Sequence, residues 1–337
     1  MLLKEEDHAE TQLLSHSMRY RPLAQTGMQI SEVALGCWPI AGMTTPDTEE
    51  TDSISTIRAC FELGINHLDT AYMYGRNGES ERLIAQALGS NRGEMVIATK
   101  GGLHWGPEGK QVHDASPATL RRECEESLRR LNTDRVELYY LHAPDKNVSL
   151  KESAGELKRL KDEGKVLSVG VSNVNLAQLE EFAAECPLAA FQPPYNMLQR
   201  GIEADTLPWC REHGVAVLVY WPLMKGLFAG KINRENLHPR DNRLKYPQFQ
   251  GEEWLKNLEL VEKLRALAEH AGHTVAQLVI NWILSQPGIT STLCGAKRPV
   301  QIRENAGGSS WQLTDNQLAA IDQALKERGP AKILSAV

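Results

Sequence analysis

Few features of the 337-residue sequence point to a membrane or an exported protein. No apolar run approaches the ~18 residues that a membrane-spanning helix needs, and the N-terminal MLLKEEDHAE has no apolar core of a secretory signal. Only six cysteines are present, scattered and without a Cys-x-x-Cys pair, which argues against a disulfide scaffold or a zinc framework. We therefore expect a cytoplasmic protein without a bound metal, whose cysteines are mostly buried free thiols.

The sequence also lacks an excess of positive charge. Lys and Arg number 37 against 43 Asp and Glu, a formal charge of −6, so no nucleic-acid partner is expected. A hydrophobic content of 42% is enough for a large core and excludes a disordered chain. Residues 1–17 are polar and without a period, so we expect a mobile N-terminal extension, followed by a domain over residues 18–337.

Short apolar runs alternate along the chain with amphipathic segments. Because the runs are continuous rather than alternating in polarity, they are typical of parallel strands covered on both faces. The eight runs are Val33–Gly36, Ile65–Asp69, Met95–Thr99, Val136–Leu141, Val166–Val171, Leu188–Gln192, Val215–Tyr220 and Thr290–Cys294. Eight βα units predict a single (β/α)8 (TIM) barrel. A doubly wound sheet is the alternative, but no G-x-G-x-x-G follows any of the runs.

Helix start and stop signals lie between the runs. Ser116, Thr274 and Thr314 are placed to cap helices, and glycines follow the ends of several others. The predicted helices are Ser53–Leu63, Ala118–Leu131, Ser149–Glu163, Ala204–His213, Glu262–Ala271, Val275–Ser285 and Asp315–Lys326. The segment Trp221–Glu253 is rich in Gly, Pro, Asn and basic residues, so we expect a long loop after strand seven. Additional helices are expected at the C-terminal end.

Polar residues follow most of the predicted strands. They are Asp69, Lys100, His142, Ser172, Asn173, Gln192 and Tyr220. Each alone has an ordinary structural explanation, such as a strand cap or a solvated charge. In a barrel, however, the C-terminal strand ends surround one cavity, where active sites are built. The joint pattern therefore predicts an active site there.

Tyr74 lies in the loop after the second strand, five residues beyond Asp69. A tyrosine with its ordinary pKa near 10 is a poor acid, but a neighbouring ammonium lowers the pKa by stabilising the phenolate. Lys100 can supply that ammonium, Asp69 can hold it, and His142 can donate a hydrogen bond to a substrate oxygen. The group suits proton donation to a carbonyl oxygen as the carbon receives a hydride.

The sequence resembles the aldo-keto reductase family from about Met18 to Leu325. Six segments, in family order, carry the resemblance: LDTAYMYG (Leu68–Gly75), ATKGG (Ala98–Gly102), YYLHAPD (Tyr139–Asp145), GVSN (Gly170–Asn173), FQPPYN (Phe191–Asn196) and GAKRPVQIRENAGG (Gly295–Gly308). The loop containing GKINRENLHPRDNRLKYP is similar to the branch with bacterial general aldo-keto reductases and potassium-channel β subunits.

The resemblance implies a (β/α)8 barrel that binds NADP(H) without a Rossmann fold. It makes Asp69, Tyr74, Lys100 and His142 a catalytic tetrad, with Tyr74 as the general acid. The residues implied in cofactor binding at the strand ends are Gly36, Trp38, Ser172, Asn173 and Gln192, with Tyr220 stacked on the nicotinamide. The loop and adenosine residues are Trp221, Pro222, Leu223, Gly226, Lys231, Arg243, Gly295, Lys297, Gln301, Glu304 and Asn305.

Two positions depart from the family pattern. Trp221 stands where a serine that would contact phosphate is usual, and packing under the loop is the alternative explanation for it. Cys294 stands where proline is common, a change we expect to be mild. The adjacent Lys297 and Arg298 favour NADPH over NADH, because the extra 2′-phosphate attracts cationic groups. Solvated loop charges are the alternative for these two residues.

These observations predict an NADPH-dependent reductase of aldehydes or ketones with a small-molecule carbonyl substrate. Pocket walls that include Trp38, Trp105 and Trp221 favour apolar or aromatic carbonyls. The alternative is a regulatory, redox-sensing protein that retains NADP(H), as in channel β subunits. A metal-dependent hydrolase is disfavoured, because no His-x-His follows the first strand and Lys100 would repel a cation. The physiological substrate and the oligomeric state stay open.

Overall fold

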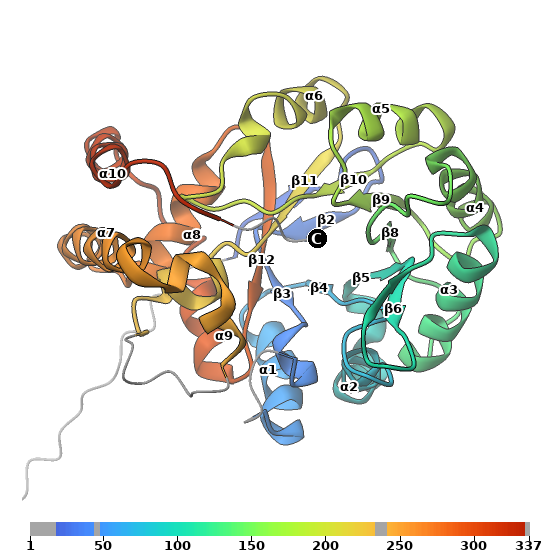
Figure 1. The fold of residues 1–337 in the computed structure, drawn as a ribbon. Coiled ribbons are helices and arrows are strands. Elements are labelled where there is room, and N and C mark those ends of the chain that lie inside the picture. The colour runs from blue at the N-terminus through green and yellow to red at the C-terminus, as the bar shows by residue number, and fades with distance from the viewer. Residues whose placement is uncertain (1–17, 44–47, 233–240, 334–337) are drawn as a thin grey trace, which may run out of the picture.

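Eight parallel strands close into a barrel in the order in which they occur along the chain (Figure 1). The computed structural model describes residues 18–43, 48–232 and 241–333. The barrel strands are β3 (Val33–Gly36), β4 (His67–Asp69), β5 (Val96–Gly101), β8 (Leu138–Leu141), β9 (Val169–Ser172), β10 (Ala190–Gln192), β11 (Ala216–Tyr220) and β12 (Ile289–Gly295). Each overlaps one of the eight predicted runs, so the (β/α)8 prediction is confirmed. The expected N-terminal extension lies outside the described residues.

Helices surround the barrel as an outer ring (Figure 1). One follows each strand: α1 (Glu50–Glu62), α2 (Glu79–Leu88), α3 (Pro117–Leu131), α4 (Leu150–Asp162), α5 (Leu176–Glu185), α6 (Thr206–Glu212), α8 (Val275–Ser285) and α9 (Pro299–Ala306). Two further helices, α7 (Gly251–His270) and α10 (Asp315–Arg328), pack against each other beside the ring. Six short 3-10 helices complete the helical elements of the described residues: η1 (Pro39–Ala41), η2 (Gly89–Glu94), η3 (Gly201–Glu203), η4 (Met224–Ala229), η5 (Asn242–Lys245) and η6 (Pro247–Phe249).

The predicted helix caps are present. The Ser116 side chain accepts a hydrogen bond from the Thr119 amide at the start of α3. Thr274 and Thr314 each form a capping box with the glutamine three residues later, at the starts of α8 and α10. Satisfied N-terminal amides explain why these three helices begin where the sequence predicts.

Several elements differ from the sequence prediction. Helix α7 begins at Gly251 rather than Glu262, so it takes up the end of the expected loop, which also contains η4, η5 and η6. Helix α2 was not predicted, because it starts after Gly78 in a left-handed conformation (φ 75°) without a side-chain cap. Helix α5 was also missed, although Asn175 and Gln178 form a capping box that the sequence displays.

Two antiparallel hairpins lie outside the barrel sheet and were not predicted. The first joins β1 (Tyr20–Pro22) to β2 (Gln29–Ser31), and the second joins β6 (Leu103–Trp105) to β7 (Gln111–His113). Leu23 and Ile30 of the first hairpin are fully buried in one cluster with residues that begin the barrel strands. This hairpin therefore closes the N-terminal end of the barrel, and the second lies at the opposite end.

The core has an outer layer between strands and helices and an inner cluster within the barrel. All six cysteines are buried and unpaired, which confirms the expectation of free thiols. Burial raises the pKa of several of these thiols, for example that of Cys60 to about 12, so they stay protonated. Among the described helices, none combines the length and the apolar character needed to cross a membrane.

Candidate functional site

Three of the residues predicted to be catalytic form a hydrogen-bonded chain at the C-terminal end of the barrel. Asp69 ends β4 and Lys100 lies near the end of β5, so neighbouring parallel strands bring the two side chains together. The Lys100 Nζ donates to Asp69 Oδ1 at 2.6 Å, to the Thr70 carbonyl at 2.7 Å and to Tyr74 Oη at 3.3 Å. The Lys100 side chain is 0% exposed, so the carboxylate compensates an ammonium that has no access to water.

The pKa of Tyr74 differs from the prediction. The ammonium of Lys100 was expected to lower it, but burial raises it well above its ordinary value, and the charge of Asp69 acts in the same direction. Burial also lowers the pKa of Lys100, against the opposing effect of Asp69. Desolvation, which the order of residues along the chain does not reveal, outweighs the nearby ammonium. Tyr74 is therefore protonated at neutral pH.

His142 follows β8, and its ring lies beside that of Tyr74 with 6.0 Å between the centroids. Burial and the charge of Lys100 hold the pKa of His142 well below its ordinary value, so the imidazole is neutral. The buried Nδ1 has no hydrogen-bond partner among the residues that the structure describes. A neutral ring with an unused nitrogen is suited to a hydrogen bond with a bound molecule.

Gln192 connects the chain of Asp69, Lys100 and Tyr74 to the strands on the other side of the barrel. Its Nε2 donates to the second oxygen of Asp69, Oδ2, at 2.7 Å. The Ser172 hydroxyl donates to the Gln192 carbonyl at 2.7 Å. Both residues stand at their predicted strand ends, and the Gln192 amide helps to orient the Asp69 carboxylate.

Asn173 and Tyr220 meet at the same end of the barrel. The Tyr220 hydroxyl donates to Asn173 Oδ1 at 2.7 Å, and Asn173 Nδ2 donates to the His142 carbonyl at 2.9 Å. Asn173 has a left-handed backbone (φ 59°), a conformation that asparagine tolerates better than most residues. This turn directs its amide toward Tyr220 and His142.

Gly36 and Gly295 pair in register at the ends of β3 and β12. A Cβ on Gly36 would lie 3.3 Å from the Leu293 carbonyl oxygen, and one on Gly295 would lie 2.9 Å from Pro39 Cγ. The two glycines therefore let neighbouring backbone and the Pro39 ring approach closely at this edge. The nearby Trp38 packs edge-on against the Tyr74 ring at 5.1 Å between centroids.

The loop after β11 has an unusual backbone and contains a cation that sequence reasoning missed. Trp221 and Lys225 both have left-handed conformations, with φ of 58° and 55°. The Lys225 Nζ lies 3.6 Å from the centroid of the Trp221 ring and 4.4 Å from that of Tyr246. Burial, with a contribution from Lys245, lowers the pKa of Lys225 to about 7. The Trp221 ring thus packs within the loop, as its alternative explanation expected; no sequence motif pointed to Lys225.

The remaining loop residues are joined to their surroundings by ion pairs. Arg243 Nη2 pairs with Asp241 at 2.7 Å, and Arg243 Nη1 donates to the Lys225 carbonyl at 3.3 Å. Lys231 Nζ pairs with Glu304 of α9 at 2.5 Å. Pro222, Leu223 and Gly226 belong to the same turn. The loop is therefore tied to the helix that carries the predicted adenosine residues.

The start of α9 gathers the residues predicted to bind adenosine. Gln301 Oε1 accepts hydrogen bonds from the amides of Lys297 at 2.9 Å and Arg298 at 3.2 Å, and Asn305 is buried one turn further on. The Arg298 Nε pairs with Asp52 of α1 at 3.2 Å. The sequence showed no carboxylate near this basic pair before Glu304, because Asp52 is 246 positions away along the chain.

These residues fit a nicotinamide dinucleotide. The loop after β11 and the start of α9 bring together cations suited to phosphates, namely Lys225, Lys231, Arg243, Lys297 and Arg298. At the strand ends, the unused Nδ1 of His142 can form a hydrogen bond with a polar group of a bound molecule.

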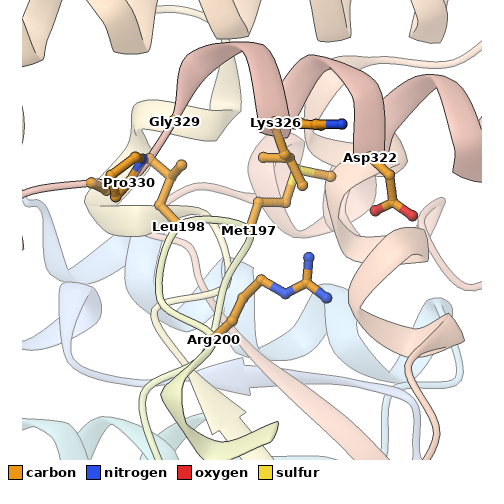
Figure 2. Close-up of a pocket in the computed structure, with 9 residues that line it drawn as sticks. Met197, Leu198, Arg200, Asp322, Lys326, Gly329 and Pro330 are labelled. Atoms are coloured by element: carbon orange, nitrogen blue, oxygen red, sulfur yellow. The ribbon is translucent and has the colours of Figure 1, made fainter.

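A separate hollow lies between η3 and α10 (Figure 2). Met197 and Leu198 line it from the loop after β10, and Gly329 and Pro330 close it from the segment after α10. The guanidinium of Arg200 points across it toward Asp322 (Figure 2). None of the predicted site residues lines this hollow.

The fold and the site define a class of barrel oxidoreductases, and comparison with known proteins agrees. The model of the Aldo/keto reductase family matches residues 32–326, and the chain belongs to this family. The sequence is 36% identical over 313 residues to aldo-keto reductase YhdN of Bacillus subtilis, covering 92% of this chain and 94% of the relative. It is 34% identical to an Escherichia coli NADH-specific methylglyoxal reductase, covering 88% and 95%.

Solved structures agree with the sequence relatives. The structure of the glycerol dehydrogenase AKR11B4 from Gluconobacter oxydans has a TM-score of 0.85 and 36% identity, covering 96% of this chain and 99% of that one. The holo form of aldo-keto reductase AKR11C1 from Bacillus halodurans has a TM-score of 0.76 and 26% identity, covering 95% and 99%. The family resemblance read from the sequence motifs is therefore confirmed.

Proposed function

We propose that this protein is an NADPH-dependent oxidoreductase that reduces aldehydes or ketones to alcohols, with Tyr74 as the general acid. The observation that carries the proposal is the buried chain from Asp69 through Lys100 to Tyr74 at the strand ends. Membership of the Aldo/keto reductase family supports the reaction class. The bound nicotinamide cofactor would supply the hydride.

Tyr74 gives its proton to the carbonyl oxygen of the substrate. Its raised pKa keeps it protonated before the reaction, and the ammonium of Lys100 at 3.3 Å stabilises the phenolate that the transfer leaves behind. Asp69 and the Thr70 carbonyl hold that ammonium in place. The neutral imidazole of His142 orients the carbonyl oxygen toward Tyr74 by a hydrogen bond.

The other predicted site residues hold the cofactor. Ser172, Asn173 and Gln192 would hold the carboxamide of the nicotinamide, and Tyr220 would stack on its ring. Gly36, Trp38 and Gly295 border the entrance. The turn from Trp221 to Gly226, with Lys231 and Arg243, would contact the diphosphate. Lys297, Gln301, Glu304 and Asn305 would bind the adenosine portion.

The choice of NADPH over NADH rests on Lys297 and Arg298, whose charges suit a 2′-phosphate. Asp52 opposes this preference, because it pairs with the half-exposed guanidinium of Arg298. The Escherichia coli relative is described as NADH-specific, so both cofactors have to be measured. Asp52→Asn is the informative variant: removing the carboxylate should tighten NADPH binding and leave NADH binding unchanged.

The substrate class follows from the aromatic residues at the entrance. Trp38 packs on Tyr74, and Trp105 lies on β6 beside the same loop, so apolar or aromatic carbonyls are favoured. Two of the similar proteins are described by small polar substrates, glycerol and methylglyoxal. The substrate panel should therefore contain both classes.

The test is loss of NADPH absorbance with a panel of aldehydes and ketones, repeated with NADH. Continued turnover with excess carbonyl supports an enzyme, whereas a single equivalent of cofactor oxidised per protein would indicate the redox-sensing alternative. Tyr74→Phe is the control, because NADPH oxidation that does not depend on the proposed acid would persist in this variant. Absence of turnover with every carbonyl and both cofactors would contradict the proposed function. The cytoplasmic location and the lack of a nucleic-acid partner stay predictions.

A further inference from the structure

The loop that carries Tyr74 is held at every backbone carbonyl from residue 70 to residue 75. Two of the carbonyls accept from backbone amides: that of Ala71 from Tyr74 N (3.0 Å) and that of Tyr74 from Ser80 N (3.3 Å). The others accept from side chains: Thr70 from Lys100 Nζ (2.7 Å), Tyr72 from Arg130 Nη1 (3.1 Å), and Met73 and Gly75 from Trp105 Nε1 (2.9 and 3.1 Å). A loop so fully bonded is fixed by several neighbouring elements. One donor differs from the others, because a single N–H serves two carbonyls.

The indole N–H of Trp105 bridges the two residues on either side of Tyr74. It donates to the carbonyls of Met73 and Gly75, at 2.9 and 3.1 Å, in a bifurcated hydrogen bond. The Trp105 ring is covered on one side by the guanidinium of Arg76 at 5.0 Å from its centroid. Trp105 therefore contacts this loop through its N–H and its ring face.

We propose that Trp105 is a positioning residue for Tyr74: its N–H holds the loop so that the phenol faces Lys100 and the substrate. This inference rests on the proposed function of Tyr74 as the proton donor. The family motif did not mark Trp105, which sequence reasoning placed in the pocket wall alone. The hairpin of β6 and β7 is thereby assigned a role in catalysis through its contact with the loop.

Tyr74 needs such support because it stands in a loop and not on a barrel strand. Its hydroxyl is 3.3 Å from Lys100 Nζ, near the outer limit of a hydrogen bond, so a small displacement would break the contact. Gly75, the next residue, has a left-handed backbone (φ 91°) that turns the chain sharply toward α2. Proton transfer depends on donor geometry, and misplacement by about 1 Å can cost up to about 10²-fold in rate.

Contacts between the β6–β7 hairpin and the loop of residues 70–75 also support a positioning role for Trp105. Leu103 at the start of β6 is buried against Ala71 and Met73. Trp105, two residues later, thus reaches the loop from a strand that is already anchored beside it. Side chains supported by a rigid element position a reacting group better than solvent-exposed contacts do.

Trp105→Phe tests the proposal, because phenylalanine keeps an aromatic ring and removes only the N–H donor and part of the ring area. We expect single-turnover reduction to slow roughly tenfold, less than the 10²–10⁴-fold expected on loss of a general acid. The cofactor Kd should be unchanged, and the loss should appear in kcat more than in KM. Trp209→Phe is the matched control, since Trp209 lies on the outer helix α6 and stacks on His213, which follows that helix.

A double-mutant cycle separates positioning of Tyr74 from a general structural role. If Trp105 acts through the Tyr74 hydroxyl, adding Trp105→Phe to Tyr74→Phe should cause little further loss of rate. Full additivity of the two losses would overturn the proposal. A benzothienylalanine at position 105 alone, which replaces N–H by sulfur and keeps the bicycle, provides the same test should the phenylalanine variant fold poorly.

Amide hydrogen exchange gives a readout that does not need turnover. Peptides covering residues 70–78 should exchange faster in Trp105→Phe than in the wild type and in Trp209→Phe. Unchanged exchange together with wild-type kcat would refute the role of Trp105, even if the enzyme is active. If the wild type were inactive, the proposed function would be contradicted instead. Faster exchange in Trp105→Phe would then still show that the Trp105 N–H holds the loop of residues 70–75 in place.

Discussion

Replacing Lys100 with methionine removes the charge at the centre of the site and keeps a side chain of similar length. The Lys100 side chain is 0% exposed and that of Asp69 is 3% exposed, so both charges of the pair are buried. Without the ammonium, the donor that remains for Asp69 among the described side chains is the neutral amide of Gln192 at 2.7 Å. The Thr70 carbonyl also loses its donor.

The expected cost follows from leaving a buried charge without its partner. Breaking a buried ion pair by removing one member typically destabilises a protein by about 3–5 kcal/mol. A buried carbonyl without a donor costs about 1–3 kcal/mol, but the two effects share one site and do not add in full. We therefore expect the free energy of unfolding to fall by about 3–5 kcal/mol, a large part of the ~5–15 kcal/mol typical of a whole protein.

Urea denaturation at pH 7, followed by circular dichroism, measures this loss, and single-turnover reduction is recorded on the same samples. The double variant Asp69→Asn, Lys100→Met is the control, because it removes the uncompensated carboxylate as well. It should be more stable than Lys100→Met although it carries one more substitution. A loss below about 1 kcal/mol in Lys100→Met, or a double variant that is less stable still, would refute the argument that the buried charge dominates.

Three further outcomes follow from the site. Tyr74→Phe should lose 10²–10⁴-fold in kcat with the cofactor Kd near that of the wild type, and a variant that keeps more than roughly a tenth of kcat would rule out Tyr74 as the acid. Lys297→Ala should weaken NADPH binding by about 1–3 kcal/mol, more at low salt than at high salt, and leave NADH unaffected; equal losses in a titration with both cofactors would contradict this. Because the pKa of Tyr74 lies well above its ordinary value, reduction should be flat over about pH 6–9 while alcohol oxidation, which needs the phenolate as base, rises with pH. Equal pH profiles in the two directions would count against that assignment.

The barrel could be predicted because its signals are local. Each strand is a short apolar run. The capping residues Ser116, Thr274 and Thr314 indicate where α3, α8 and α10 begin. Elements without such signals were missed or misplaced: α2 begins after a left-handed glycine, and α7 begins inside a segment whose composition is typical of a loop. A capping side chain helps to predict where a helix begins but does not ensure it, because α5 was missed although Asn175 and Gln178 form a capping box.

The proximity of the site residues could be predicted for the same reason. Parallel strands of a barrel have their C-terminal ends on the same side. Asp69 and Lys100, at the ends of the neighbouring strands β4 and β5, are therefore expected to lie close together. Contacts made by long side chains between elements that are distant in sequence are not indicated by any sequence pattern. Arg298 pairs with Asp52 of a distant helix, and Trp105 reaches Met73 from a hairpin that no pattern indicated.

Burial is the quantity that the order of residues could not supply, and it decides the chemistry at two lysines. The sequence placed an ammonium beside Tyr74 and predicted a lower pKa for the phenol, yet desolvation raises that pKa. In the loop after β11, burial, with a contribution from Lys245, lowers the pKa of Lys225 to about 7, although its neighbours in sequence suggest an ordinary surface lysine. A carboxylate at 2.6 Å accompanies Lys100, whereas no described carboxylate pairs with Lys225. Lys100 is therefore suited to hold a permanent charge beside the reacting group, and Lys225 to take up a proton when an anion arrives.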